Sequence, residues 1–310
     1  MKKTLPIILG LLASISSFAQ QVDYRVISVD EERGRDMTKI TSESDQVFWA
    51  PVNRTRNGIT WFRNRLIALS PNGNEIAFLS FPGDRMNVFV KKLDRTAGSV
   101  QLTNRDLVLE LSYSPDGTTL CLTDATESSH QILTTSAAGG YNYRQITYGA
   151  LDFSPMYNDD MTNIFFSRNE ERGDCVWSFD TRDNTLCRWA SGECPCPIPG
   201  TKSFVCGRVN SAGKKEIWKI DCEKGTEECI VSGSGSFATP SVSPEGDWMV
   251  FTGETAVPYG KRYYYNTDIY ACRTDGSQLT QLTFHVCEDR SPCCCSSRIC
   301  SYDRCFQEKG

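Results

Sequence analysis

The residues of this chain that could do chemistry are cysteines far more often than histidines. The 310-residue sequence contains 15 cysteines and only two histidines, His130 and His285. A metal site built on several imidazole ligands therefore cannot be assembled from this chain alone. The sequence also contains no Gly-x-Ser-x-Gly elbow, the local frame of one large class of serine hydrolases. We therefore expect a non-enzymatic protein with no catalytic residue, no metal site and no cofactor.

One group of cysteines surrounds a proline-rich turn. Its members are Cys187, Cys194, Cys196 and Cys206. The Cys-x-Cys spacing lacks the two-residue spacer of common zinc ligand pairs, so a local disulfide or free thiols are favoured over zinc. Other cysteines lie in apolar runs, as Cys121 and Cys272 do, and these are interpreted as small buried hydrophobic residues.

A second group of cysteines crowds into the C-terminal tail, residues 293–310. It contains Cys293, Cys294, Cys295, Cys300 and Cys305. One interpretation is a disulfide-rich tail, and the other is a shifted reading frame. The shifted frame is favoured because the cluster matches no regular disulfide or zinc spacing. Cysteine codons read one base later also give valine or alanine, which would suit a strand at this place.

The architecture that must carry these residues is set by a short phrase that occurs four times. The copies are Leu69–Gly73, Tyr113–Gly117, Phe153–Pro155 and Val242–Gly246. Their serines are separated by 44, 40 and 89 residues, and the last interval is close to two periods. Strand-rich units with a period of about 40–45 residues are typical of a β-propeller. Proline followed by Asn or Asp and Gly favours a tight turn, so these serines are interpreted as structural rather than nucleophilic.

Each phrase begins a unit in which four short strands are predicted. An alternating apolar strand follows the turn, as in Glu75–Ser80 and Trp248–Thr252. The fourth strand ends in Leu-Thr or Ile-Thr at Gln101–Thr103, Gln145–Thr147 and Gln281–Thr283. A degenerate unit around Pro197–Gly200 fills the long interval.

The last unit, which starts at Asp289–Pro292, has no room for four strands before the chain ends. Tyr24–Val29 and Thr38–Thr41 match the third and fourth strands of a unit. We therefore predict an all-β, six-bladed propeller of four-stranded blades, with the closing blade shared between the N- and C-terminal segments. Such a closure ties the first blade to the last and leaves no open sheet edge.

With these phrases and strand endings, the chain resembles the TolB-type propeller repeat family, a WD-repeat-like group. The resemblance is strongest over Leu69–Thr103, Tyr113–Thr147 and Val242–Thr283. It implies a six-bladed propeller in the bacterial cell envelope that serves as a docking platform for other proteins. The α/β domain that precedes the propeller in TolB is expected to be absent here, because few residues come before the first phrase.

The N-terminus has the pattern of a secretory signal peptide. A basic start, Met1–Lys3, precedes an apolar run, Leu5–Leu12, and the small residues Ser17 and Ala19. We predict a signal peptide over residues 1–19 and a single propeller domain over residues 20–310, periplasmic or secreted after cleavage. The apolar run is too short to span a bilayer comfortably, so no membrane insertion is expected. A net charge of −5 with interspersed signs argues against nucleic acid as a partner.

Candidate partner-binding residues cluster in an insertion of the fifth unit, Pro258–Asn266. They are Arg262, Tyr263, Tyr264 and Tyr265, together with Trp61 from an earlier loop. Tyrosine, tryptophan and arginine are enriched in interface hot spots, so we expect these residues to bind an unknown envelope protein or peptide. The alternative is that the tyrosines pack on the neighbouring blade.

Two further alternatives stay open. Asn158–Asp160 could help to bind calcium, although an Asp-rich turn is favoured. The rival function is a glycan- or peptide-degrading enzyme, or an accessory protein, with its substrate in the central channel. Carboxylates that converge in the channel beside aromatic residues would favour a sugar, whereas a flat rim of aromatic residues and arginine would favour a protein.

Overall fold

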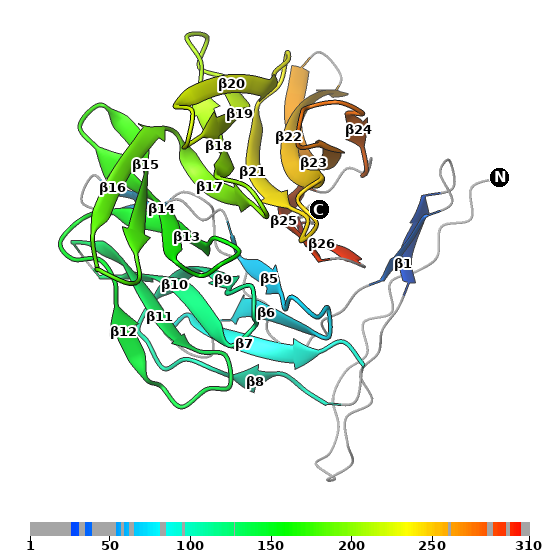
Figure 1. The fold of residues 1–310 in the computed structure, drawn as a ribbon. Helices are drawn as coiled ribbons and strands as arrows, with labels where there is room; N and C mark the ends of the chain where they lie inside the picture. Colours follow the sequence, from blue (N-terminus) through cyan, green and yellow to red (C-terminus); the bar gives the residue numbers. More distant parts are fainter. Residues whose placement is uncertain are drawn as a thin grey trace, which may run out of the picture.

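The protein folds as a ring of antiparallel sheets around a central axis (Figure 1). The computed structural model describes residues 26–30, 35–38, 54–56, 59–61, 65–80, 85–94, 97–126, 128–259, 262–283, 288–295 and 298–304. Five sheets have four strands each, and in every one the strands follow one another in chain order. The prediction of an all-β propeller is thus confirmed, with five complete blades. Within the described ranges, no helix is long and apolar enough to cross a membrane.

The bounds of the five complete blades follow the predicted period. Blade 1 consists of β5 (Ile67–Leu69), β6 (Glu75–Ser80), β7 (Asn87–Lys92) and β8 (Val100–Gln101). Blade 2 consists of β9 (Val108–Tyr113), β10 (Thr119–Ala125), β11 (His130–Ser136) and β12 (Tyr143–Gln145). Blade 3 consists of β13 (Asp152–Tyr157), β14 (Asn163–Glu170), β15 (Gly173–Asp180) and β16 (Leu186–Ser191). Blade 4 consists of β17 (Glu193–Ile198), β18 (Ser203–Val209), β19 (Lys215–Asp221) and β20 (Thr226–Val231). Blade 5 consists of β21 (Phe237–Val242), β22 (Trp248–Tyr259), β23 (Arg262–Arg273) and β24 (Thr280–Gln281).

The second strand of a blade is buried on both of its faces, because each blade packs between two others. Large side chains of these strands are almost completely buried at Phe78, Phe166, Phe204 and Phe251. Cys121 and Cys272 are also fully buried in strands, which confirms their interpretation as small hydrophobic residues. The apolar runs that predicted these strands therefore form the core between the blades.

The repeated Leu-Thr and Ile-Thr endings have a structural explanation. The hydroxyl oxygen of the threonine accepts a hydrogen bond from a backbone N–H of the third strand. The bonds join Val88 to Thr103 (2.8 Å), Ile132 to Thr147 (2.9 Å) and Ile269 to Thr283 (2.9 Å). The side chain thus satisfies a main-chain donor where the short fourth strand has ended.

One of the four phrases does not form the predicted turn. Phe153–Pro155 lies inside β13, where the register with β14 shifts between Phe153 and Met156. The turn of blade 3 comes a few residues later, at Asn158, which lies 44 residues after Ser114. Asn158 Oδ1 accepts the backbone N–H of Asn163 at 2.8 Å, just as Ser114 Oγ accepts that of Thr119 at 3.0 Å. Asp160 closes the same turn by accepting the N–H of Thr162 at 3.0 Å, as the turn interpretation of this segment predicts.

Ser154 and Pro155 of that phrase form part of a β-bulge instead, and this bulge recurs in other innermost strands. In blades 3, 4 and 5 and in β25, the residue before a proline has a positive φ. These residues are Ser154 (53°), Cys194 (53°), Thr239 (52°) and Ser291 (50°). The strand register shifts at each of them, as expected for a β-bulge.

Three further hairpins complete the described chain. β25 (Glu288–Cys295) pairs with β26 (Arg298–Arg304), and β25 contacts both β21 of blade 5 and β5 of blade 1. In the Cys-rich tail, residues 293–295 and 298–304 therefore lie in strands, with Cys293 opposite Cys300. β1 (Val26–Asp30) pairs with β2 (Arg35–Thr38), and β3 (Arg54–Arg56) pairs with β4 (Ile59–Trp61). Among the strands the structure describes, β1–β2 and β25–β26 are separate two-stranded sheets.

Candidate functional site at the mouth of the central channel

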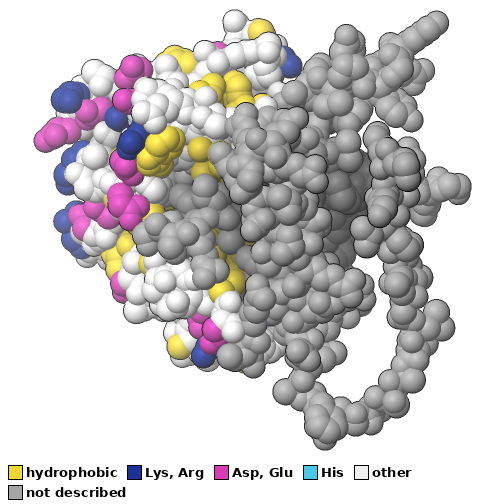
Figure 2. All heavy atoms as spheres, turned by 90° about the vertical axis from the view of Figure 1, so that its right-hand side faces the viewer, with side chains coloured by type: hydrophobic (Ala, Val, Ile, Leu, Met, Phe, Trp, Pro, Cys, Tyr) yellow, Lys and Arg dark blue, Asp and Glu magenta, His cyan; other side chains and the backbone are white. Residues whose placement is uncertain are grey.

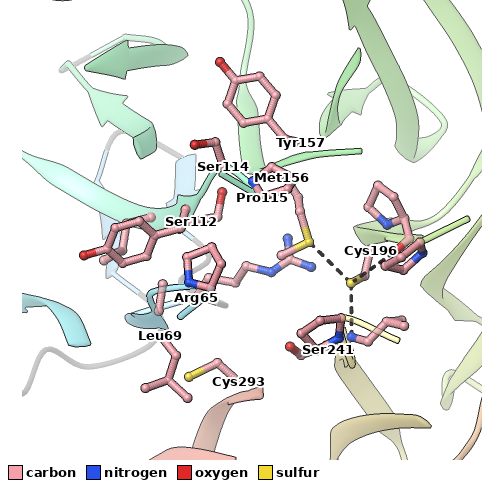
Figure 3. A pocket seen from close by; sticks show the side chains of 18 of the residues that line it. Arg65, Leu69, Ser112, Ser114, Pro115, Met156, Tyr157, Cys196, Ser241 and Cys293 are labelled. Atoms are coloured by element: carbon pink, nitrogen blue, oxygen red, sulfur yellow. Dashed lines mark hydrogen bonds between the residues drawn. The ribbon is translucent and has the colours of Figure 1, made fainter. Parts of the chain in front are cut away.

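A pocket opens where the innermost strands of the blades converge on the ring axis (Figure 3). Its volume is about 320 Å³. Six innermost strands surround the pocket: β5, β9, β13, β17, β21 and β25. At one equivalent position, each of these strands has a residue that lines the pocket wall. This ring consists of Ala68, Ser112, Met156, Cys196, Ser241 and Cys293. The repeat thus produces a circular site in which the six positions supply four kinds of side chain: alanine, serine, methionine and cysteine.

The rim of the pocket is made by the turns that follow these strands. Pro71, Pro115, Pro199 and Pro244 all line it. Each turn is closed by a backbone hydrogen bond, such as Gly73 N to Ser70 O at 2.8 Å and Gly246 N to Ser243 O at 2.8 Å. Proline fixes φ in such turns, so the rim is rigid as well as apolar. The predicted role of the Ser-Pro serines in turn formation is confirmed for Ser70, Ser114 and Ser243 and is wrong for Ser154, which lies in a bulge.

The floor of the pocket is the guanidinium of Arg65, a residue that sequence reasoning missed. Arg65 is only 7% exposed, although it lies two residues before the first strand of blade 1. Its Nη1 donates to the carbonyl of Ser154 at 3.0 Å, and its Nη2 donates to that of Pro195 at 2.9 Å. Weaker contacts from Nη2 reach the carbonyls of Cys194 and Pro240, both at 3.3 Å. One side chain therefore joins the innermost strands of blades 3, 4 and 5.

The backbone around Arg65 extends this connection to the rest of the ring. Its carbonyl accepts the N–H of Leu111 in β9 at 3.1 Å. The N–H of Leu66 donates to Ser291 Oγ in β25 at 3.3 Å. Arg65 and Leu66 together thus contact the innermost strands of blades 2, 3, 4 and 5, and also β25.

A buried carboxylate lies at the same level of the channel. Glu110 is fully buried and accepts hydrogen bonds from Ser154 Oγ at 3.0 Å and from Thr123 Oγ1 at 3.0 Å. It also accepts the backbone N–H of Ser154 at the bulge. These three donors satisfy a charge that would otherwise be costly to bury.

The described lining of the pocket is mostly apolar and offers few groups for proton transfer. Its single carboxylate is Asp159, which accepts the backbone N–H of Gly200 at 2.7 Å. Burial raises the pKa of the Tyr113 and Tyr157 hydroxyls, so neither is an effective base near neutral pH. Burial also raises the pKa of the Cys196 thiol, against an opposing influence of Arg65. The pocket is better suited to binding than to acid–base chemistry.

The predicted partner-binding residues lie on two hairpins. Arg262 begins β23, and Tyr263, Tyr264 and Tyr265 continue it; Arg262 pairs with Tyr259 in β22. The predicted insertion is therefore a continuous extension of the β22–β23 hairpin. Trp61 ends β4. The side chains of these five residues lie outside the described part of the structure, so their binding role stays a prediction.

The four cysteines around the proline-rich turn do not form one cluster. Cys194, Cys196 and Cys206 are buried, whereas Cys187 is exposed on β16. All four are free thiols, as one of the sequence interpretations proposed. No group of three or more potential metal-ligating His, Cys, Asp or Glu residues occurs in the described ranges.

Charged side chains on the surface are mixed in sign. Figure 2 shows acidic and basic groups interspersed over the described part of one face. Many of them form pairs, such as Arg208 with Glu227 at 2.8 Å and Arg273 with Asp247 at 2.7 Å. This surface gives no basic stripe of the kind that nucleic-acid binding uses.

The fold and the circular site define a β-propeller with a pocket at its axis. A family model described as TolB beta propeller domain matches residues 66–256. The chain therefore belongs to the TolB β-propeller family. No curated protein matches the sequence.

Solved structures show the same fold at low sequence identity. A TolB protein from Agrobacterium tumefaciens superimposes with a TM-score of 0.60 at 15% identity, covering 71% of this chain and 80% of its own. TolB from Acinetobacter baumannii gives a TM-score of 0.60 at 19% identity, covering 73% of this chain. The match spans 56% of the Acinetobacter protein.

Proposed function

We propose that this chain is an exported, non-enzymatic binding protein of the cell envelope, with a protein or peptide as its ligand. Its membership of the TolB propeller family supports a role built on the propeller. The predicted signal peptide, residues 1–19, lies outside the described residues, so export rests on the sequence pattern alone.

The observation that carries this proposal is the rigid, mostly apolar pocket with Arg65 at its floor. The Arg65 guanidinium is held there by carbonyls of three blades. A ligand that enters the pocket would rest against the proline rim. Such a pocket fits an apolar side chain of a partner, anchored at the centre of a larger contact surface.

The rival enzyme or glycan-binding role finds less support at this site. A sugar site would need several convergent polar groups beside aromatic side chains. Asp159 is the only carboxylate among the described lining residues, and it is engaged by the backbone of Gly200. The aromatic β22–β23 extension supplies the second candidate contact surface, as the sequence predicted.

We also propose that the ring is completed by a sixth blade shared between the two chain ends. β25 occupies the place between blades 5 and 1 and repeats the positive-φ bulge before proline at Ser291. The hydrogen bond from Leu66 N to Ser291 Oγ joins it to blade 1. In this proposal β25 and β26 are its inner strands, and β1 and β2 supply its outer strands.

The test of binding compares three variants in capture from envelope extracts. Replacing Arg262, Tyr263 and Tyr264 by alanine removes the hairpin surface, and Ala68→Phe fills the pocket. Leu186→Ala, at an exposed position on the outer edge, is the matched control. We expect capture to fall in the first two variants and to persist in the third, with the melting temperatures of the triple variant and of the control within a few degrees of that of the unaltered protein. Undiminished capture by both would contradict it, and a large loss of stability in the triple variant would mean that its residues belong to the core.

A further inference from the structure

Two sulfur atoms meet in the wall of the pocket. The Cys196 thiol on β17 approaches the Met156 thioether on β13, with 3.3 Å between Sγ and Sδ. Figure 3 shows both side chains directed at the same part of the pocket, beside the guanidinium of Arg65. They occupy equivalent ring positions of neighbouring blades, so the fold places them together without any local sequence motif.

Burial raises the pKa of the Cys196 thiol, and two features of its surroundings act against this rise. The backbone N–H of Val242 donates to Cys196 Sγ at 3.3 Å. The Arg65 guanidinium donates a hydrogen bond to the carbonyl of Pro195, the residue that directly precedes Cys196. A hydrogen-bond donor and a fixed positive charge both stabilise a thiolate more than a thiol.

We propose that Cys196 and Met156 bind a soft monovalent cation, copper(I), at the mouth of the channel. Thiolate and thioether sulfur are soft ligands of the kind that copper(I) prefers, and a thioether suits it better than it suits hard cations. On binding, the Cys196 S–H bond breaks, its proton passes to the solvent, and sulfur–copper bonds form without any change of oxidation state. This inference is independent of the proposed partner.

The pocket can admit the ion without unfolding the ring. Cys196 is 3% exposed and Met156 is half-buried, and both line a cavity of about 320 Å³ that opens to the surface. The two sulfur atoms must move apart to receive a cation between them. Methionine is unbranched and changes rotamer easily, so Met156 can make this movement. Hard cations such as calcium need several oxygen ligands, and Asp159 is the only carboxylate of the described lining.

The direct test observes Met156 itself. The protein has six methionines, and labelling their methyl groups with ¹³C gives a signal for each. The Met156 signal is the one that disappears in Met156→Leu. We expect one equivalent of copper(I), added to the reduced protein without oxygen, to shift this signal in the unaltered protein and in Cys206→Ser. Cys206 is a buried cysteine of the same blade that does not line the pocket, so it is the matched control.

A second measurement gives the affinity by competition with a coloured copper(I) chelator. Met156→Leu should weaken the tightest site by about tenfold or more, and Cys196→Ser should remove it. The proposal is overturned if the Met156 signal stays in place when copper(I) is bound, or if it shifts equally in Cys196→Ser. Affinity that is unchanged in both variants would place the ion on other cysteines and would also overturn it. Silver(I), which is not oxidised in air, should shift the same signal in the unaltered protein, so the test does not depend on a variant that folds.

Discussion

At the residue scale, the centre of the molecule depends on one arginine. The Arg65 guanidinium spans carbonyls of β13, β17 and β21, whereas its backbone contacts β9 and its neighbour Leu66 contacts β25. Hydrogen bonds from a charged donor to buried carbonyls are among the stronger ones in proteins. Because the innermost strands have no other common contact of this kind in the described structure, Arg65 defines both the closure of the ring and the floor of the pocket.

Arg65→Met tests this role because methionine keeps an unbranched apolar stem and removes every donor. We expect the free energy of unfolding to fall by about 2–4 kcal/mol, since buried carbonyls lose their partner. Arg85→Met is the matched control, because the Arg85–Asp106 pair is exposed at both ends (64% and 87%). It should change stability by less than about 0.5 kcal/mol. Urea denaturation measures the free energy of unfolding of both variants. Equal losses of stability would contradict the proposed role of Arg65 in closing the ring.

His130 makes stability depend on pH. Burial lowers its pKa to about 4, from an ordinary value of 6.5. The folded state therefore holds the neutral imidazole, and the unfolded state takes up a proton first as the pH falls. The stabilisation is complete above about pH 6.5 and is lost as the pH falls towards 4. The urea midpoint should decrease over this range, and the decrease should be smaller in His130→Gln; identical slopes would contradict the assignment.

At the element scale, the sequence predicted the period but misplaced one turn. Pro71, Pro115 and Pro244 do mark turns, whereas Pro155 follows a bulge inside β13. The same dipeptide, Ser-Pro, occurs in two backbone geometries, a turn and a β-bulge. Only the hydrogen bonds of Asn158 show where the turn of blade 3 lies. The threonine endings were recognised from the sequence, but their role as acceptors of a third-strand N–H needed three-dimensional register.

The candidate site was the least predictable feature. Its ring residues share one position in each repeat but no single residue type, so no sequence motif indicates that Met156, Cys196 and Ser241 are neighbours. Arg65 precedes the first phrase and carries no pattern of its own. Aligning the repeats by their turns would have brought the ring positions together, and that is the signal the sequence did contain.

Gly253 tests the packing of blade 5 against its aromatic cluster. A Cβ added there would lie 2.5 Å from a ring carbon of Tyr270 and 3.0 Å from one of Phe237. These two rings make an edge-to-face contact with a centroid distance of 5.7 Å. Gly253→Ala should therefore destabilise the protein by about 1–3 kcal/mol through overpacking.

The matched control for this change is Gly207→Ala in β18. A Cβ there would meet its nearest atom, in Glu193, at 3.6 Å, which is an ordinary contact. Its effect on stability should be clearly smaller than that of Gly253→Ala. Thermal melting compares the two, and equal losses would mean that strand glycine itself, and not the aromatic cluster, determines the cost.

At the scale of the whole molecule, the proposed closure makes the two chain ends interdependent. Removing residues 20–42 deletes β1 and β2, the proposed outer strands of the sixth blade. The remaining β25–β26 hairpin would keep an open edge, so the ring should lose stability as a whole and unfold in one transition at lower temperature. A truncated protein that melts like the full chain would refute the shared blade.

The whole surface also decides where a partner can bind. Among the described residues, the pocket and its proline rim form a mostly apolar site, and the β22–β23 extension carries the predicted aromatic contact residues. A photoreactive amino acid placed at Glu245, an exposed residue of the rim turn, reports on contacts at the channel mouth. The same group at Leu186, on the outer edge of blade 3, is the control position.

Photocrosslinking in the intact envelope of a producing cell is the measurement that tests the binding platform most directly. The account predicts a discrete crosslinked product from Glu245 and none of that size from Leu186. The product should diminish when Ala68→Phe fills the pocket. Equal products from both positions, or a product from Leu186 alone, would contradict the assignment of the channel mouth as the partner site.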